Sequence, residues 1–154
     1  MNEFCNVIDA DKIIATALKC LEERLTYAAG EKFVSSRPVC DYLRLQLAQE
    51  KNEVFAALFM DNQHRLFSFE RLFTGTVNEA VVYPRCVIQK ALQFNAAAII
   101  VAHNHPSGAA KPSSADESLT SELKKVLEII NVKMLDHIVV TLTETYSFAE
   151  HGLL

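Results

Sequence analysis

Apolar residues recur every three to four positions in the first fifty residues, which is the period of amphipathic helices. Residues 10–28 predict one helix, for which Gly30 offers a stop. The stretch "SSRPVCDYLRLQLAQE" predicts a second helix, with Ser36 as a candidate cap before Pro38. The apolar faces are expected to consist of Ile13, Ile14, Ala17, Leu18, Leu21 and Leu25 in the first helix, and of Val39, Tyr42, Leu43 and Leu47 in the second.

The hydrophobic pattern changes after residue 52 and becomes typical of β-strands. Residues 53–60, "EVFAALFM", form a continuous apolar run of strand length, which indicates burial on both faces. "DNQH" is a turn candidate, and "RLFSFERLF" returns with a more alternating pattern. We therefore predict an antiparallel hairpin over residues 53–73.

The second half of the chain alternates helices with strands. Buried strands are predicted at "AAAIIVA" (96–102) and "VKMLDHIVVTL" (132–142), helices begin at Pro84 and Ser113, and residues 145–154 are expected to form a short tail. This order predicts an α/β fold with a mixed β-sheet flanked by helices. The apolar helix positions are Val87, Ile88, Ala91 and Leu92, then Leu119, Leu123, Val126, Leu127 and Ile130.

Charge and cysteine usage narrow the functional classes. The 154 residues include 15 Lys and Arg against 19 Asp and Glu, and these charges are interspersed, so strong nucleic-acid binding is not expected. The four cysteines lack the close spacing of zinc ribbons or redox motifs, and the N-terminus carries acids where a secretory signal has an apolar segment. The apolar run at 96–102 is too short for a membrane span. We therefore expect a reduced, cytoplasmic protein whose thiols pack as small apolar groups.

Two of the five histidines follow directly on a predicted strand, in "VAHNHPSGAAKPSSADESLT" (101–120). In an extended chain, His103 and His105 point to the same side. Asp116 falls in the first turn of the next helix, and the intervening glycine and prolines can fold the loop back. Two imidazoles and one carboxylate form a standard catalytic zinc set, which leaves the fourth position for water.

Simpler interpretations explain parts of this segment. Ser113 and Asp116 also have the spacing of a capping box, which needs no metal. A single histidine after a buried strand is usually a hydrogen-bonded structural residue, and "HPSG" alone is a plausible turn. The weight for a metal site comes from the conjunction of all these positions.

Other metal-dependent classes fit the sequence less well. Zinc nucleobase deaminases need a histidine-x-glutamate followed by P-C-x-x-C, and the cysteines are missing here. The H-E-x-x-H motif of thermolysin-like enzymes is also missing. Barrel amidohydrolases use His-x-His, but their fold needs about 250 residues.

The spacing H-x-H-P-x6-S-x2-D is the JAMM signature of the MPN+/JAB metalloprotease domains. "NAAAIIVAHNHPSG", "GTVNEAVVYPR" and "LDHIVV" resemble the RadC family, which is built on this domain. The resemblance implies a JAB/MPN-like, cytidine-deaminase-like core over residues 36–154. Residues 1–35 would be an N-terminal helical extension, too short for the helix-hairpin-helix module of full-length members. The chain thus resembles a short, stand-alone form.

The resemblance also implies roles for five residues. His103, His105 and Asp116 would hold one Zn²⁺ per chain. Ser113 would stabilise the tetrahedral oxyanion. Glu53 would polarise the zinc-bound water and pass its proton to the leaving amine, although without the resemblance its position favours a solvated strand end. Glu53 and Ser113 are expected to matter for turnover and not for metal retention.

Two functional hypotheses follow from the resemblance. The first is a zinc-dependent hydrolase that cleaves a peptide or isopeptide bond in an unknown peptide or protein substrate. The alternative is a DNA-repair-associated accessory or interaction module without turnover. The intact five-residue set favours the enzyme. Asn104 also matches a family position and is expected to shape the metal loop, whereas Asp136 and His137 are expected to be structural, or at most to support the ligands.

Overall fold

The computed structural model describes residues 7–27, 37–76 and 80–154. The apolar run at 53–60 forms β1, which lies between β2 and β3 in a five-stranded sheet. The strand order is β2-β1-β3-β4-β5. β3 and β4 pair in parallel, whereas the other neighbouring strands pair antiparallel. The strands are β1 (Val54–Met60), β2 (Leu66–Thr74), β3 (Ala98–Asn104), β4 (Lys133–Val140) and β5 (Thr145–Ser147).

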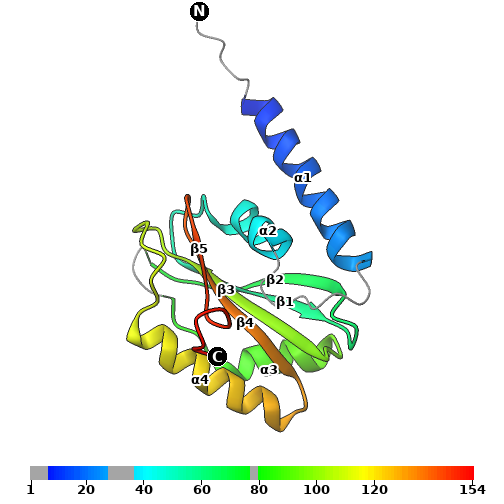
Figure 1. Cartoon of the computed structure of the whole chain (residues 1–154), viewed down its shortest axis with the longest axis vertical. Coiled ribbons are helices and arrows are strands. Elements are labelled where there is room, and N and C mark those ends of the chain that lie inside the picture. Colours follow the sequence, from blue (N-terminus) through cyan, green and yellow to red (C-terminus); the bar gives the residue numbers. More distant parts are fainter. Residues whose placement is uncertain (1–6, 28–36, 77–79) are drawn as a thin grey trace, which may run out of the picture.

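Helices cover both faces of this sheet, with α2 on one side and α3 and α4 on the other (Figure 1). The helices are α1 (Val7–Tyr27), α2 (Arg37–Leu47), α3 (Pro84–Gln93) and α4 (Ser114–Ile129). This architecture is the predicted α/β fold with a mixed sheet, and the predicted hairpin is the β1–β2 pair. The double cover explains why every residue of β1 and of β3 is buried.

Alternation along β1 supplies two separate cores. Ala56 and Leu58 face α2, whose predicted apolar positions Val39, Tyr42, Leu43 and Leu47 are all buried. Phe55 and Phe59 face the opposite side and pack with residues of α3 and α4. Successive side chains of a strand point to opposite faces, so one apolar run can fill both cores.

The C-terminal half of α1 belongs to the α2 core. Leu25 is buried there, and the Tyr42 hydroxyl donates a 2.8 Å hydrogen bond to Glu22. The N-terminal half extends beyond the body of the molecule (Figure 1), and Ile13 is 65% exposed. The candidate stop Gly30, the candidate cap Ser36 and the expected domain boundary after residue 35 lie outside the described residues.

Two expectations about local environment are wrong, those for Cys20 and for the tail. Cys20 is exposed, whereas Cys40 packs against the α2 core as expected; Cys20, Cys40 and Cys86 are free thiols, and Cys5 lies outside the described residues. Leu92, an apolar position of α3, is 59% exposed, because α3 turns only Val87 and Ala91 fully into the core. The expected tail contains a short strand, β5, that pairs with the end of β4. Among the described residues, no helix is long and apolar enough to cross a membrane.

Candidate metal centre

Both histidines lie at the carboxyl end of β3, His103 within the strand and His105 directly after it. β1 and β3 are antiparallel neighbours with Phe55 opposite His103, so Glu53 lies level with residue 105. Backbone pairing with β4 continues past the end of β3, where the His105 N–H donates to the carbonyl of Val140 over 2.9 Å. The loop then turns at Gly108, whose φ of +88° is a conformation that favours glycine.

The three predicted ligands converge. The Nε2 atoms of His103 and His105 are 2.9 Å apart. The Asp116 carboxylate completes the triangle, with Oδ1 3.3 Å from Nε2 of His103 and Oδ2 3.5 Å from Nε2 of His105. His103 is buried and the other two are half-buried, so the group opens to solvent on one side. These residues could together bind a metal ion.

The imidazoles are held by their outer nitrogens. Nδ1 of His105 donates to the carbonyl of Ala109 over 2.7 Å, and Nδ1 of His103 lies 2.8 Å from Nε2 of His137. Because a carbonyl can only accept, His105 must carry its proton on Nδ1, which leaves the Nε2 lone pair directed at Asp116. Acceptor atoms that face one another repel unless a cation, either a proton or a metal ion, lies among them.

The size of the triangle suits zinc. A tetrahedral ion with metal–ligand distances of about 2.0–2.2 Å keeps its ligand atoms about 3.3–3.6 Å apart. The two distances from the Asp116 carboxylate fall in this range but end on different oxygens, Oδ1 toward His103 and Oδ2 toward His105, and the histidine nitrogens are slightly closer together. One ligand atom from each residue lies within 4.8 Å of the others, so the donor set suits a zinc ion once small side-chain movements bring the atoms to equal spacing.

The electrostatics of the triangle favour a cation. Burial by itself would raise the pKa of Asp116, but hydrogen bonds with His103 and His105 outweigh it and hold that pKa well below its usual range. The same contact with Asp116 raises the pKa of His105. Without a metal, a proton on His105 is therefore the cation that the carboxylate attracts.

Ser113 combines two of the interpretations that the sequence left open. It is the N-cap of α4, and the capping box is present, since its Oγ accepts from the Asp116 N–H over 3.1 Å while its own N–H donates to the Asp116 carboxylate. Its hydroxyl also donates to Asp116 Oδ2 over 2.7 Å. The cap thus orients the carboxylate of the triangle, and the bond from the hydroxyl to Oδ2 adds to the capping box that the sequence predicted.

Glu53 lies beside the three predicted ligands, in the cavity onto which they open. It lines a cavity of about 340 Å³ together with His103, His105, Ser113 and Asp116. Burial raises the pKa of Glu53, while the neighbouring histidines and the backbone N–H of Ala80 oppose this rise. A half-buried carboxyl with a raised pKa beside a metal-binding group has the properties of a general base. The other lining residues are Phe55, Ala80, Val82, Pro106, Ser107, Ala115 and Leu119.

Two buried polar residues lie around the triangle, and for one of them, His137, the contact with His103 is the supporting role that the sequence left open. Asn104 was expected to shape the metal loop, but its side chain instead bonds the backbone on both sides of Glu53: Oδ1 accepts from the Val54 N–H over 2.7 Å, and Nδ2 donates to the Asn52 carbonyl over 3.0 Å. His137 is fully buried, and burial lowers its pKa well below the ordinary value, so its ring is neutral. A polar residue inside a buried strand was the available signal for both residues.

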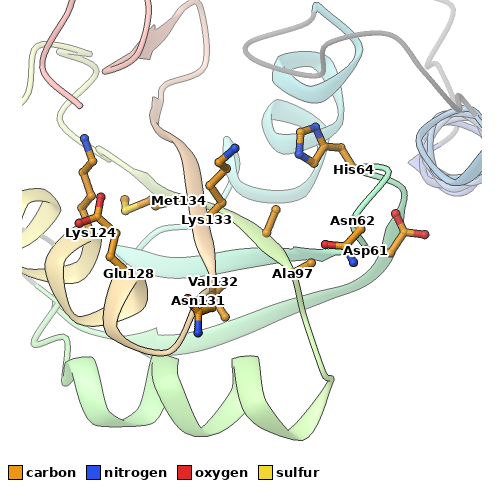
Figure 2. A pocket seen from close by; sticks show the side chains of 11 residues that line it. Asp61, Asn62, His64, Ala97, Lys124, Glu128, Asn131, Val132, Lys133 and Met134 are labelled. Carbon is orange, nitrogen blue, oxygen red and sulfur yellow. The ribbon is translucent and has the colours of Figure 1, made fainter.

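A second cavity of about 590 Å³ lies at the opposite end of the sheet, where β3 and β4 begin. Figure 2 shows its side chains spread around the rim, with His64 near the β1–β2 turn and Lys124 and Glu128 on α4. Charges of both signs line it without converging on one point. Neither His64 nor His151 lines the cavity of about 340 Å³ that holds the triangle.

The fold and the triangle define the class of the protein: an α/β domain with a mixed sheet and a His-His-Asp group that could bind a metal ion. Residues 33–153 match the family model of the RadC-like JAB domain. The chain therefore belongs to the RadC-like JAB domain family, as its motifs predicted.

Curated relatives are similar over most of the chain. A UPF0758 protein of Methylibium petroleiphilum is 54% identical over 142 residues, which are 92% of this chain and 63% of that protein. The UPF0758 protein YkfG of Escherichia coli is 47% identical over 143 residues, which are 93% of this chain and 90% of YkfG. The chain therefore spans less than two thirds of the Methylibium relative but nearly all of YkfG. The names of these two relatives specify no activity.

Proposed function

We propose that this protein is a zinc-dependent hydrolase of the JAMM type that cleaves a peptide or isopeptide bond. The observation that carries this proposal is the triangle of His103, His105 and Asp116 with Glu53 at its mouth, in a cavity that is open to solvent. These three ligands would hold the ion. Zinc, when bound, supplies a Lewis acid and lowers the pKa of a coordinated water to about 7.

The chain's own residues supply the remaining functions. Glu53 would accept a proton from the attacking water and return it to the leaving amine; its position in the cavity and its raised pKa support this role. The Ser113 hydroxyl can turn from Asp116 toward a developing oxyanion, since Asp116 keeps the bond from the Ser113 N–H. Both groups reach the same cavity, so one substrate can contact both.

The cavity wall bears on the substrate. Beside the polar groups it is lined by Val82, Pro106 and Leu119, none of which carries charge. Such a wall accommodates a small apolar group next to the scissile bond and contributes no charge that would select an ionic one. We therefore propose a peptide or protein substrate without a charged side chain at this position.

The test begins with metal content. Protein purified without chelator is analysed for zinc by mass spectrometry, titrated to one equivalent, and assayed against peptides and isopeptide-linked conjugates. Glu53→Gln should abolish turnover while one zinc per chain stays bound, because it removes the base but no ligand. Asp116→Asn should lose the zinc itself.

A matched control separates these effects from general loss of charge. Glu117→Gln removes an exposed carboxylate one residue from Asp116 and should leave zinc content and turnover unchanged. Zinc loss in Glu53→Gln would show that Glu53 is a ligand. The absence of stoichiometric zinc binding in the wild-type protein would refute the proposal.

A further inference from the structure

A β-bulge turns His137 toward the triangle. Ile99 of β3 pairs with Met134 of β4, but the next residue of β3 pairs with Asp136, so Leu135 is an extra residue on β4. Met134 and Leu135 point into opposite cores, as alternation requires. The bulge then shifts the alternation by one, which places His137 on the α4 face instead of the α2 face.

Buried contacts hold the bulge in this form. The carboxylate of Asp136 accepts hydrogen bonds from the N–H groups of His137 over 2.7 Å and Ala149 over 3.0 Å. It also accepts a 2.6 Å bond from the Ser147 hydroxyl. The Phe148 ring stacks on the imidazole of His137 with 4.6 Å between centroids. The ring of His137 is therefore fixed by the end of the chain as well as by β4.

Hydrogen bonds through both nitrogens of His137 connect two predicted ligands, Asp116 and His103. Nδ1 lies 2.6 Å from the Thr120 hydroxyl, and Nε2 lies 2.8 Å from Nδ1 of His103. The Thr120 hydroxyl donates to the main-chain carbonyl of Asp116 over 2.6 Å. Three consecutive short bonds thus run from the backbone of one predicted ligand to the ring of another.

The chemistry of the partners sets the direction of these bonds. The Asp116 carbonyl can only accept, so it takes the single hydroxyl hydrogen of Thr120. The Thr120 oxygen must then accept from Nδ1 of His137. The ring of His137 is fully buried and its nitrogens face a hydroxyl and an imidazole, so burial favours the uncharged form, in which Nε2 is an acceptor. Nε2 consequently accepts the Nδ1 proton of His103. The remaining nitrogen of His103, Nε2, presents its lone pair to His105 and Asp116.

We propose that His137 and Thr120 are positioning residues that fix the tautomer and ring orientation of His103 for metal binding. This inference rests on the metal site proposed above. Partners of this kind hold a ligand in its binding-competent form, and their loss typically lowers metal affinity by about 10–100-fold. Because the bonds start at the backbone of Asp116, they also tie the first turn of α4 to the end of β3.

Paired variants test the hydrogen bonds separately from packing. Thr120→Val preserves shape but removes the hydroxyl, whereas Thr120→Ser keeps it. His137→Phe preserves the stacked ring without its nitrogens, whereas the side-chain carbonyl of His137→Gln can still accept from His103. Zinc dissociation constants are measured by competition with a chromophoric chelator. We expect about 10–100-fold weaker binding for Thr120→Val and His137→Phe, with wild-type affinity in Thr120→Ser and partial rescue in His137→Gln.

A second readout reports the tautomers directly. In zinc-loaded wild-type protein with ¹⁵N-labelled histidine, NMR should show His137 neutral with its proton on Nδ1, and His103 likewise protonated on Nδ1. A proton on Nε2 of His137 would overturn the inference. So would wild-type zinc affinity in Thr120→Val, and this pair decides the question even if His137→Phe does not fold.

The inference and the proposed function fail in different ways. A wild-type protein that binds no zinc would overturn both. Tight zinc binding by the wild type and by all four variants would overturn the positioning role alone and leave the proposed function standing.

Discussion

Asn104 accepts a 2.7 Å hydrogen bond from the backbone N–H of Val54 through its side-chain oxygen. The bond joins the carboxyl end of β3, between the two histidines of the triangle, to the residue that follows Glu53. The amide nitrogen of Asn104 donates to the carbonyls of Glu50 and Asn52 on the other side. One buried side chain thus sets the position of the predicted base relative to the predicted ligands.

Asn104→Ala should therefore lower both stability and turnover while zinc stays bound. A buried N–H without a partner costs about 1–3 kcal/mol, and urea unfolding of the metal-free protein should show a loss of this size. Turnover should fall because Glu53 loses its fixed place. The exposed Asn62→Ala is the control and should stay within about 0.5 kcal/mol of the wild type. Unchanged turnover in Asn104→Ala would show that Glu53 does not depend on this contact.

Ser113→Ala should lower both the stability and the turnover rate of the protein. Loss of the helix cap should lower the free energy of unfolding by about 0.5–2 kcal/mol. Loss of an oxyanion donor should lower the turnover rate by about 10²–10³.

The structure adds a third expectation for this variant, which differs from that of the sequence. The Ser113 hydroxyl bonds the Asp116 carboxylate, so zinc affinity should also fall. Ser113→Thr keeps a hydroxyl that can cap and is the matched control. Equal zinc affinity in Ser113→Ala and wild type would mean that the backbone N–H of Ser113 alone orients Asp116.

The His105–Asp116 pair should contribute less to the stability of the metal-free protein as pH rises from 6 to 8, whereas the lowered pKa of His137 adds stability as pH rises toward 6.5. The pKa of His105 is raised above its ordinary value of 6.5, so its contribution is fully present below that pH and is lost as pH rises through the folded-state pKa. The pKa of Asp116 is lowered from 3.8, so its contribution is fully present above that pH and is lost progressively as pH falls below it. The pair thus stabilises the metal-free chain most between these two ordinary values.

Zinc should reverse this slope. The metal binds deprotonated imidazole, so its stabilisation grows as pH rises and protons leave His105. Thermal melting from pH 6 to 8, with chelator and with excess zinc, measures both slopes. Subtracting the corresponding slopes of Asp116→Asn removes contributions from the rest of the protein. Parallel slopes with and without zinc would contradict the prediction.

Duplex DNA should not bind this chain on its own with useful affinity. Nonspecific binding needs several Lys or Arg side chains directed at phosphates, and the chain has 15 of these residues against 19 acids. The loop between His105 and Ser113 contains one basic residue, Lys111. A titration of labelled duplex at about 150 mM salt should show no saturable binding in the low micromolar range. Saturable binding that weakens steeply with salt would support the DNA-repair-associated alternative.

The sequence by itself determined the elements that carry the triangle. The continuous apolar runs predicted β1 and β3 because strands covered on both faces are apolar at most positions instead of at every second one. The His-x-His spacing placed two imidazoles together at a strand end, and the spacing of Ser113 and Asp116 predicted the start of α4. All of these are local patterns, which the period and the capping chemistry of the chain encode directly.

Only the tertiary structure decided which residues support the triangle. His137 lies 34 positions from His103 in the sequence, and the two meet because one extra residue in β4 shifts the alternation of the strand. Glu53 comes level with residue 105 through the β1–β3 register, and Asn104 reaches back over 50 positions to Val54. Strand register and bulges depend on pairing between distant segments, and the local period of apolar residues carries no information about them.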